Sequence, residues 1–260
     1  MKSASNRYKD GEIMKKISLT QGYATVVDDD DLAKVSVCSW QVFVNKKDGM
    51  PYARSWKLGR MSRFLMGAKS GEEVDHKNHD TLDNRRDNLR VCTRGENCCN
   101  RKIQFNKHGY KGVFAGYTDL SGHIHYRGRV RCCKKSYGGR SRKYSVLAAK
   151  DYDDLAKKHH GEFACLNFPC SIRREHIARM IMSTNGRVFK ITFIKRADNS
   201  ERTIVGRVGV KKHLKNIGGR YSPEKAKLVV VFDMQDRVYK AIPIEGIHAF
   251  YFGGKKYRVD

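Results

Sequence analysis

The sequence has few acidic residues and no long hydrophobic run. Its 260 residues include 27 Asp and Glu against 53 Lys and Arg, which gives a formal net charge of +26. A charge this large favours an anionic partner, with nucleic acid first and an acidic membrane surface second. No apolar run approaches the roughly 20 residues of a membrane span, and the N-terminus lacks the apolar core of a signal peptide. We therefore expect a cytoplasmic protein that binds nucleic acid and has no membrane partner.

The cysteines lack the spacing of a zinc site. No CxxC pair occurs, so neither a zinc ribbon nor a zinc knuckle is indicated. The adjacent pairs Cys98-Cys99 and Cys132-Cys133 could each supply a metal ligand, but their spacing does not require one. Reduced thiols in a reducing compartment are the simpler interpretation.

Periodicity and turn residues divide the chain into five segments and predict a multidomain α+β fold. A polar tail comes first, followed by a β-rich region and a polar segment. Next come three short strands with an amphipathic helix, and then a short helix with five short strands and Gly-rich turns, typical of a small β-barrel. In order, the segments are 1–14, 15–60, 61–105, 106–169 and 170–260.

Local patterns predict several details. The aspartate run 28–31 lacks EF-hand spacing, so we expect a solvated turn there. Trp40 and Phe43 are expected to pack a small core, and no strand should run through Pro51. The amphipathic helix should end at Gly161 and bury one face. The residues expected on that face are Val146, Ala149, Tyr152 (or Asp153) and Ala156.

Residues 74–101, "VDHKNHDTLDNRRDNLRVCTRGENCCNR", concentrate His, Asp and Asn. Asp75 and His76 are adjacent, Asn88 follows His76 by twelve residues, and Asn97 follows Asn88 by nine. The stretch "TRGE" is a capping box, which predicts a helix starting after Thr93 with Asn97 in its first turn. The predicted order is strand, loop, strand, helix.

This order brings a strand carboxylate close to a helix amide. Both groups are hard oxygen ligands of the type that suits Mg²⁺, and a neutral His beside them can act as a general base. Together they describe metal-assisted hydrolysis of a phosphodiester. A polar surface loop is the alternative, because Asp and Asn are common in turns, but the combined spacing favours a site.

The motifs "DH", "LDNRRDNLR" and "T-x-x-x-N" resemble the HNH homing endonucleases of phages and group I introns. "LTQGYATVVDDDD…W…YAR" is also similar to their N-terminal part. The resemblance implies a ββα-metal fold, with one divalent metal, Mg²⁺ or alternatively Mn²⁺. The implied roles are metal binding by Asp75 and Asn97, water activation by His76, a brace for the His-bearing loop at Asn88, and bracing of the turn by Asn84 and Arg85.

Two positions depart from the pattern of that family. Ser62-Arg63 stands where "HR" is usual, and we expect this change to be structural. His79 stands where Gly is usual, and we expect it to occupy a tight turn.

Residues 101–143 are strongly basic, and Asp119 is their only acid. Such a bias predicts a phosphate-binding surface. Arg127, Arg129 and Arg131 alternate along a predicted strand and should share one face, as suits a sheet that reads a major groove. The predicted DNA-binding residues are these three together with Lys111, Arg101 and Lys102.

Part of the segment 106–169 resembles the apetala-two (ethylene-response-factor) DNA-binding domain. The stretches that carry the resemblance are "YKGVFAGY", "YRGRV" and "AAKDYDDLAKKHHGEFACLNFP". That resemblance implies three strands in the groove and a helix behind them. The last segment is loosely similar to Src-homology-3-like barrels of phage proteins, and its basic "KKHLKNIGGR" loop could touch DNA.

The sequence thus predicts a site-specific, homing-type DNA endonuclease that leaves 5′-phosphate and 3′-hydroxyl ends. We expect a phage- or intron-encoded protein in the bacterial cytoplasm, acting on double-stranded DNA, with a monomer favoured. Two alternatives stay open, a non-catalytic DNA-binding regulator and a basic protein associated with RNA or the ribosome.

Overall fold

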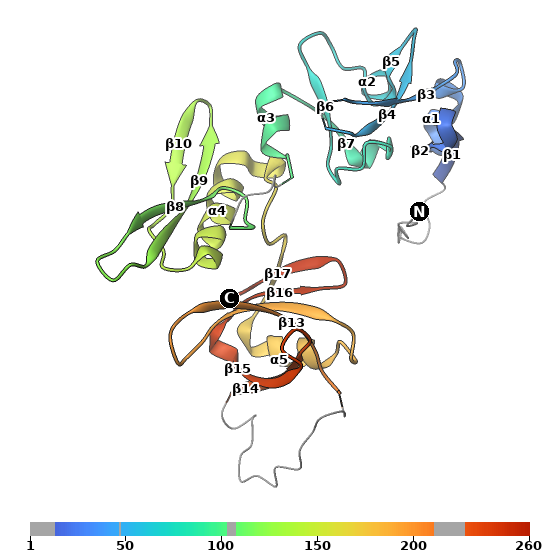
Figure 1. Cartoon of the computed structure of the whole chain (residues 1–260). Coiled ribbons are helices and arrows are strands. Elements are labelled where there is room, and N and C mark those ends of the chain that lie inside the picture. The colour runs from blue at the N-terminus through green and yellow to red at the C-terminus, as the bar shows by residue number, and fades with distance from the viewer. Residues whose placement is uncertain (1–13, 47, 103–107, 211–226) are drawn as a thin grey trace. The chain divides into compact units, whose positions relative to one another are not determined.

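The computed structural model describes residues 14–46, 48–102, 108–210 and 227–260. The polar tail (except its last residue) and the "KKHLKNIGGR" loop therefore lie outside the described residues. The chain forms two compact units, Met1–Arg101 and Lys102–Asp260, and each is described by itself (Figure 1). The fold is α+β with several small antiparallel sheets and one mixed sheet of seven strands, and the finer five-segment division stays a prediction.

In its described residues, the first unit is built from two hairpins, a three-stranded sheet, three short α-helices and two 3-10 turns. Its hairpins pair β1 with β2 and β6 with β7, and its sheet has the order β3-β4-β5. A buried cluster that includes Trp40, Met61 and Leu65 holds these parts together. The elements are β1 (Met14–Ser18), β2 (Ala24–Asp28), α1 (Asp29–Val35), β3 (Gln41–Val44), β4 (Pro51–Ser55), β5 (Gly59–Arg60), α2 (Met61–Met66), β6 (Glu73–His76), β7 (Leu89–Cys92) and α3 (Arg94–Cys99).

The aspartate run and Phe43 differ from their predictions. Asp28 precedes helix α1 and Asp31 is buried inside it, so the run is not a solvated turn. Asp31 is buried because its carboxylate receives both Nε and Nη2 of Arg86, each at 2.7 Å. Trp40 joins the core, but Phe43 lies on the exposed face of its strand. Pro51 is the first residue of β4, where its missing N–H costs no internal pairing.

The second unit starts with three antiparallel strands in the order β10-β9-β8. These are β8 (Val113–Thr118), β9 (Ile124–Cys132) and β10 (Lys135–Gly138), and helix α4 (Ser145–His160) packs against β9. All the positions predicted for the buried helix face are buried, and Gly161 follows the helix with a φ of 54°. Gly128 permits the close packing, since a Cβ there would lie 2.4 Å from the carbonyl oxygen of Ala148.

The remaining strands form an open mixed sheet, and the predicted β-barrel is wrong. The order β11-β17-β16-β12-β13-β14-β15 leaves β11 and β15 as edges, with no pairing between them among the described residues. The stretch "HAFYFGGKKYRV" forms a hairpin of two strands that turns at Gly253-Gly254. The elements are β11 (Cys170–Ile172), α5 (Arg174–Met182), β12 (Phe189–Ile194), β13 (Glu201–Arg207), β14 (Leu228–Asp233), β15 (Val238–Pro243), β16 (Ile247–Phe252) and β17 (Lys255–Val259).

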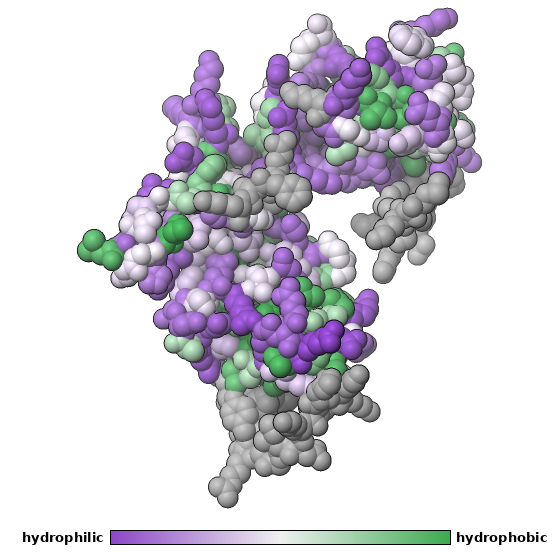
Figure 2. Space-filling model, in the orientation of Figure 1, coloured by the Kyte–Doolittle hydropathy of each residue, from purple (hydrophilic) through white to green (hydrophobic). Residues whose placement is uncertain are grey.

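Helix α4 links the two sheets of the second unit. One core cluster contains Val113 of β8, Val146 of α4 and Ala249 of β16. In addition, the Lys150 ammonium on α4 donates a hydrogen bond to the carbonyl of Val259 in β17. Among the described residues no helix is long and apolar enough to cross a membrane. On the face shown in Figure 2, hydrophilic side chains predominate in both units, with smaller hydrophobic patches.

Candidate active site

The β6–β7 hairpin positions Asp75 and His76. Asp75 lies opposite Arg90 and His76 opposite Leu89, and Leu89 anchors the hairpin in the core. Both functional side chains are only 6% exposed. Helix α3 follows, and the predicted capping box is present, because the Glu96 N–H donates to Thr93 Oγ1 at 3.3 Å and the Thr93 N–H donates to the Glu96 carboxylate at 2.8 Å.

Asp75 is held by a guanidinium and an amide. Arg90 Nη2 donates to Asp75 Oδ2 at 2.6 Å, and Asn100 Nδ2 lies 2.9–3.0 Å from both carboxylate oxygens. Asn97, the predicted metal partner of Asp75, instead donates its Nδ2 to the Glu73 carboxylate at 2.5 Å. The sequence motifs do not single out Asn100, which is the C-cap residue of α3, three positions after Asn97.

The tautomer of His76 follows from a chain of buried hydrogen bonds. Thr25 Oγ1 donates to the Leu82 carbonyl at 2.6 Å, so it can only accept from Asn84 Nδ2, 2.8 Å away. The amide of Asn84 is thereby oriented with Oδ1 toward His76 Nε2, at 3.4 Å. Because Oδ1 only accepts, Nε2 carries the proton and Nδ1 carries the lone pair.

Burial favours the neutral form of His76. Desolvation lowers the pKa of His76 and outweighs the opposite effects of the Asn84 hydrogen bond and the Asp75 carboxylate. A neutral imidazole with a free Nδ1 can accept a proton, which is the requirement for a general base.

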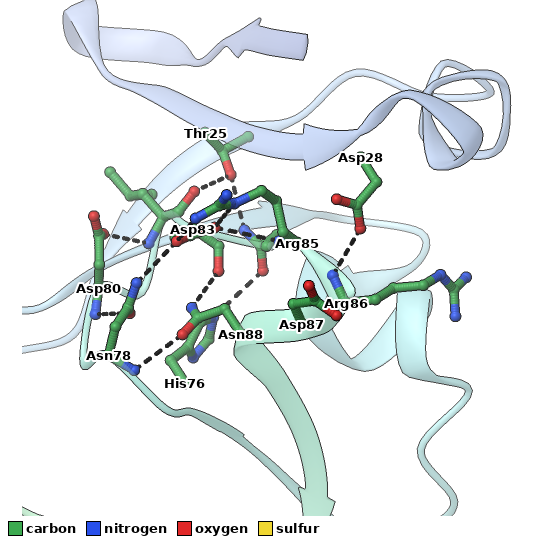
Figure 3. Close-up of polar contacts among 12 residues, drawn as sticks. Thr25, Asp28, His76, Asn78, Asp80, Asp83, Arg85, Arg86, Asp87 and Asn88 are labelled. Atoms are coloured by element: carbon green, nitrogen blue, oxygen red, sulfur yellow. Dashed lines mark hydrogen bonds and ion pairs between the residues drawn. The ribbon is translucent and has the colours of Figure 1, made fainter. Parts of the chain in front are cut away.

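Asn88 fastens the loop that follows His76. Its Oδ1 accepts from the Asn78 N–H at 2.9 Å, and its Nδ2 donates to the Asp83 carbonyl at 2.7 Å. Its own carbonyl accepts from the Lys77 N–H at 2.9 Å. His79 lies at the turn of this loop with a φ of 65°, in agreement with the expected tight turn. Figure 3 shows how these polar groups converge beneath the N-terminal hairpin.

The same loop is tied to strand β2. The Val26 N–H donates to the Leu82 carbonyl at 2.9 Å, and the Asn84 N–H donates to the Val26 carbonyl at 2.8 Å. Asp83 is buried and receives Nε and Nη2 of Arg85, each at 2.8 Å. Burial raises the pKa of Asp83, but the Arg85 contacts outweigh it and the net pKa is lowered. The N-terminal hairpin is therefore part of the site's scaffold, a role that the sequence motifs do not indicate.

The comparison with protein families agrees with this geometry. Residues 67–98 match the family model of HNH endonucleases. The chain carries an HNH endonuclease domain. This domain makes the protein a phosphodiester hydrolase and implies DNA as its substrate. No curated protein and no solved structure matches the chain.

HNH nucleases generally use a divalent metal, and the donors of this HNH domain suit one. In the described part of the chain, no group of three or more His, Cys, Asp or Glu is arranged to hold a metal. The predicted pair is smaller, with the buried Asp75 carboxylate and the amide of Asn97. Since Asn97 Nδ2 donates to Glu73, its Oδ1 is the atom left for a cation, and both donors are hard oxygens. A bound cation would compete with Arg90 and Asn100 for Asp75.

The predicted DNA-binding arginines of this endonuclease lie together on β9. Arg127, Arg129 and Arg131 are exposed, while Gly128 and Val130 between them are buried against α4. The Arg129 guanidinium lies 5.5 Å from the ring centre of the exposed Phe114 on β8.

The other predicted DNA-binding residues lie outside the strands. Lys111 is half-buried, and its main-chain N–H donates to Asn167 Oδ1 at 2.7 Å. Arg101 and Lys102 are exposed where the two units meet in the sequence. His125, which shares a strand with the arginines, instead lies 3.0 Å from the Asp119 carboxylate.

Proposed function

We propose that the protein is a site-specific DNA endonuclease of the homing type, encoded by a phage or a mobile intron. The observation that carries this proposal is the buried His76 whose protonated nitrogen is fixed by Asn84 and Thr25, beside the Asp75 carboxylate. This arrangement provides a general base whose proton-accepting nitrogen is defined by its hydrogen bonds, next to an oxygen that can bind a metal. The phage or intron origin rests on the sequence resemblance of residues 74–101.

His76 takes the first proton in the proposed reaction. Its Nδ1 accepts a proton from water, and the resulting hydroxide attacks the phosphorus in line with the leaving 3′ oxygen. The bond to that oxygen breaks, and the released 3′ oxygen takes a proton from a solvent water, which leaves 5′-phosphate and 3′-hydroxyl ends. The Oδ1 of Asn84 accepts a hydrogen bond from the protonated Nε2 of His76, which keeps the proton on that nitrogen and restrains rotation of the imidazole ring. Asn88 keeps the loop after His76 closed.

Asp75 and Asn97 are the residues that would hold one divalent cation, with Mg²⁺ first and Mn²⁺ as the alternative. When bound, the cation supplies positive charge that stabilises the crowded phosphate and the leaving oxygen. Glu73 orients the Asn97 amide for this role by accepting from its Nδ2.

The β8-β9-β10 sheet binds double-stranded DNA in this proposal. Its arginine row faces solvent, and the helix behind it supports the sheet. Arginine can contact phosphates or pair with the edge of guanine in the major groove. We propose that Arg127, Arg129 and Arg131 make such contacts, that Lys111, Arg101 and Lys102 add phosphate contacts, and that the enzyme acts as a monomer.

Plasmid nicking tests the proposal. Wild-type protein with Mg²⁺ should convert supercoiled plasmid carrying the cognate site into nicked or linear DNA, and EDTA should stop the reaction. His76→Ala should lower the rate by roughly 10²–10⁴-fold. His79→Gly is the matched control, because it removes a histidine from the same loop at a position that suits glycine, and it should retain activity. DNA binding without cleavage by wild type would instead favour a non-catalytic regulator.

A further inference from the structure

The exposed face of sheet β3-β4-β5 carries aromatic rings and arginines. Tyr52, Arg54 and Trp56 alternate along β4 and beyond it, and Phe43 lies directly opposite Tyr52 on β3. Trp56 is 83% exposed, which is unusual for the residue with the largest apolar surface. Scattered exposed apolar residues need no explanation, but a continuous set on one face marks an interaction surface.

The two arginines on this face are held by rings. The Arg54 guanidinium lies 5.1 Å from the ring centre of Phe43 and 5.7 Å from that of Trp56. Arg60 lies opposite Arg54 in the register, and its guanidinium is 4.1 Å from the ring centre of Tyr52. Stacking on a ring fixes the plane of a guanidinium and leaves its N–H edges available for an anion.

Other arginines of the same unit behave differently. Arg85, Arg86 and Arg90 each pair with a buried aspartate at 2.6–2.8 Å. Within the described residues, no carboxylate lies at salt-bridge distance from Arg54 or Arg60. The charge of this face is therefore not neutralised within the described fold, and it complements an anionic partner.

The face extends to the candidate active site. The ring of Tyr52 meets the ring of His76 edge-on, with centres 6.4 Å apart. In addition, Thr81, in the loop after His76, donates a hydrogen bond to the Pro51 carbonyl at the start of β4. A polymer lying along this face would thus reach the base that we assign to the reaction.

We infer that this face, defined by Phe43, Tyr52, Arg54, Trp56 and Arg60, seats the DNA duplex beside the bond that is cut. Arg54 and Arg60 contact backbone phosphates, and the rings of Phe43 and Trp56 pack on the adjoining sugars. The inference rests on the proposed DNA-cleaving function and adds a second DNA-binding surface, on the first unit, to the arginine row of β9.

Binding without metal tests the inference separately from cleavage. The probe is a 5′-labelled duplex of mixed sequence, about 30 base pairs long, titrated with the full chain in EDTA at several salt concentrations. Arg54→Ala and Arg60→Ala should each reduce the salt dependence of log K by about 0.9, as expected when one phosphate is no longer neutralised. Together they should weaken binding roughly ten-fold or more at low salt. Lys69→Ala is the matched control, because Lys69 is an exposed cation of the same unit that lies outside strands β3, β4 and β5 in the sequence.

Tryptophan fluorescence gives a second readout that needs no variant. The chain has two tryptophans, and Trp40 is buried, so acrylamide quenching reports mainly on Trp56. The duplex should protect Trp56 from acrylamide. Unchanged quenching together with wild-type affinity and salt dependence in both arginine variants would overturn the inference, while plasmid nicking by wild type would leave the proposed function intact.

Two further outcomes are also decisive. Protection of Trp56 without DNA, in a protein that sediments as a dimer, would assign the face to a second copy of the chain and overturn the inference. Wild type that binds the duplex but never nicks plasmid would remove the proposed function, and the arginine variants would still decide whether this face binds DNA.

Discussion

The loop of the HNH domain and strand β9 are both rich in polar and charged residues, yet the fold uses them in opposite ways. In the loop, Asp83, Asn84 and Asn88 are buried and form hydrogen bonds within the loop or to the N-terminal hairpin. On β9, the arginines alternate with buried residues and face solvent. A buried polar network fixes one geometry, as a proton acceptor requires, whereas an exposed charged row stays available to a partner.

The largest effect, on the free energy of unfolding, is expected when the buried Arg85–Asp83 ion pair is broken. Arg85→Ala leaves Asp83 buried without its guanidinium, and removing one member of a buried pair costs about 3–5 kcal/mol. Urea unfolding followed by tryptophan fluorescence measures this for Arg85→Ala, because both tryptophans lie in the first unit, and hydrogen exchange of the β9 amides measures the effect of Arg127→Ala in the second unit. The exposed Arg127→Ala should change the unfolding free energy by about 0.5 kcal/mol or less. Equal destabilisation of the two variants would erase the distinction between the loop and the strand.

A smaller effect, on binding alone, is expected from the outward-facing row. Changing Arg127, Arg129 and Arg131 to Gln should weaken DNA binding by about 10–100-fold at low salt, and the salt dependence of log K should fall by about 0.9 for each phosphate that is no longer neutralised. Filter binding in EDTA measures both quantities, and unfolding of the triple variant should match wild type. A weaker affinity with an unchanged salt dependence would indicate that these arginines bind bases rather than phosphates.

The smallest effect concerns a buried polar group in the second unit. Burial, with Lys150 and Arg174 nearby, lowers the pKa of His248 to about 4, and its Nδ1 has no hydrogen-bond partner among the described residues. In the unfolded chain His248 is protonated near pH 6.5, whereas in the folded chain it is protonated only near pH 4. Stability should therefore fall as the pH drops from about 6.5 to about 5, by roughly 1–2 kcal/mol from this group.

Hydrogen exchange of the β12 and β16 amides at the two pH values measures that decrease in stability. In His248→Gln the pH dependence over this interval should become weaker by the same amount, because the titrating group is gone. An unchanged slope would mean that His248 is not responsible.

Local patterns predicted much of the fold because their causes are local. Alternation along β9 follows from the strand period, and the end of helix α4 follows from a glycine that accepts a positive φ. The capping box that starts α3 joins residues three positions apart. The barrel prediction was wrong because a strand-forming pattern is a local property, whereas closure of a sheet depends on which distant strands pair.

The candidate site divides in the same way. The sequence by itself placed Asp75 and His76 at the end of a strand and Asn97 in the first turn of a helix, since those positions depend on short spacings. Only the tertiary structure brings Asn100 into hydrogen-bond contact with Asp75. The same structure brings Asn84 to Thr25, 59 residues away in the sequence, where the two side chains form a hydrogen bond. It also buried Asp31 against Arg86, which turned an expected surface run into scaffold. The reason is that a buried polar side chain must find a partner, and composition does not specify which distant residue the fold will bring to it.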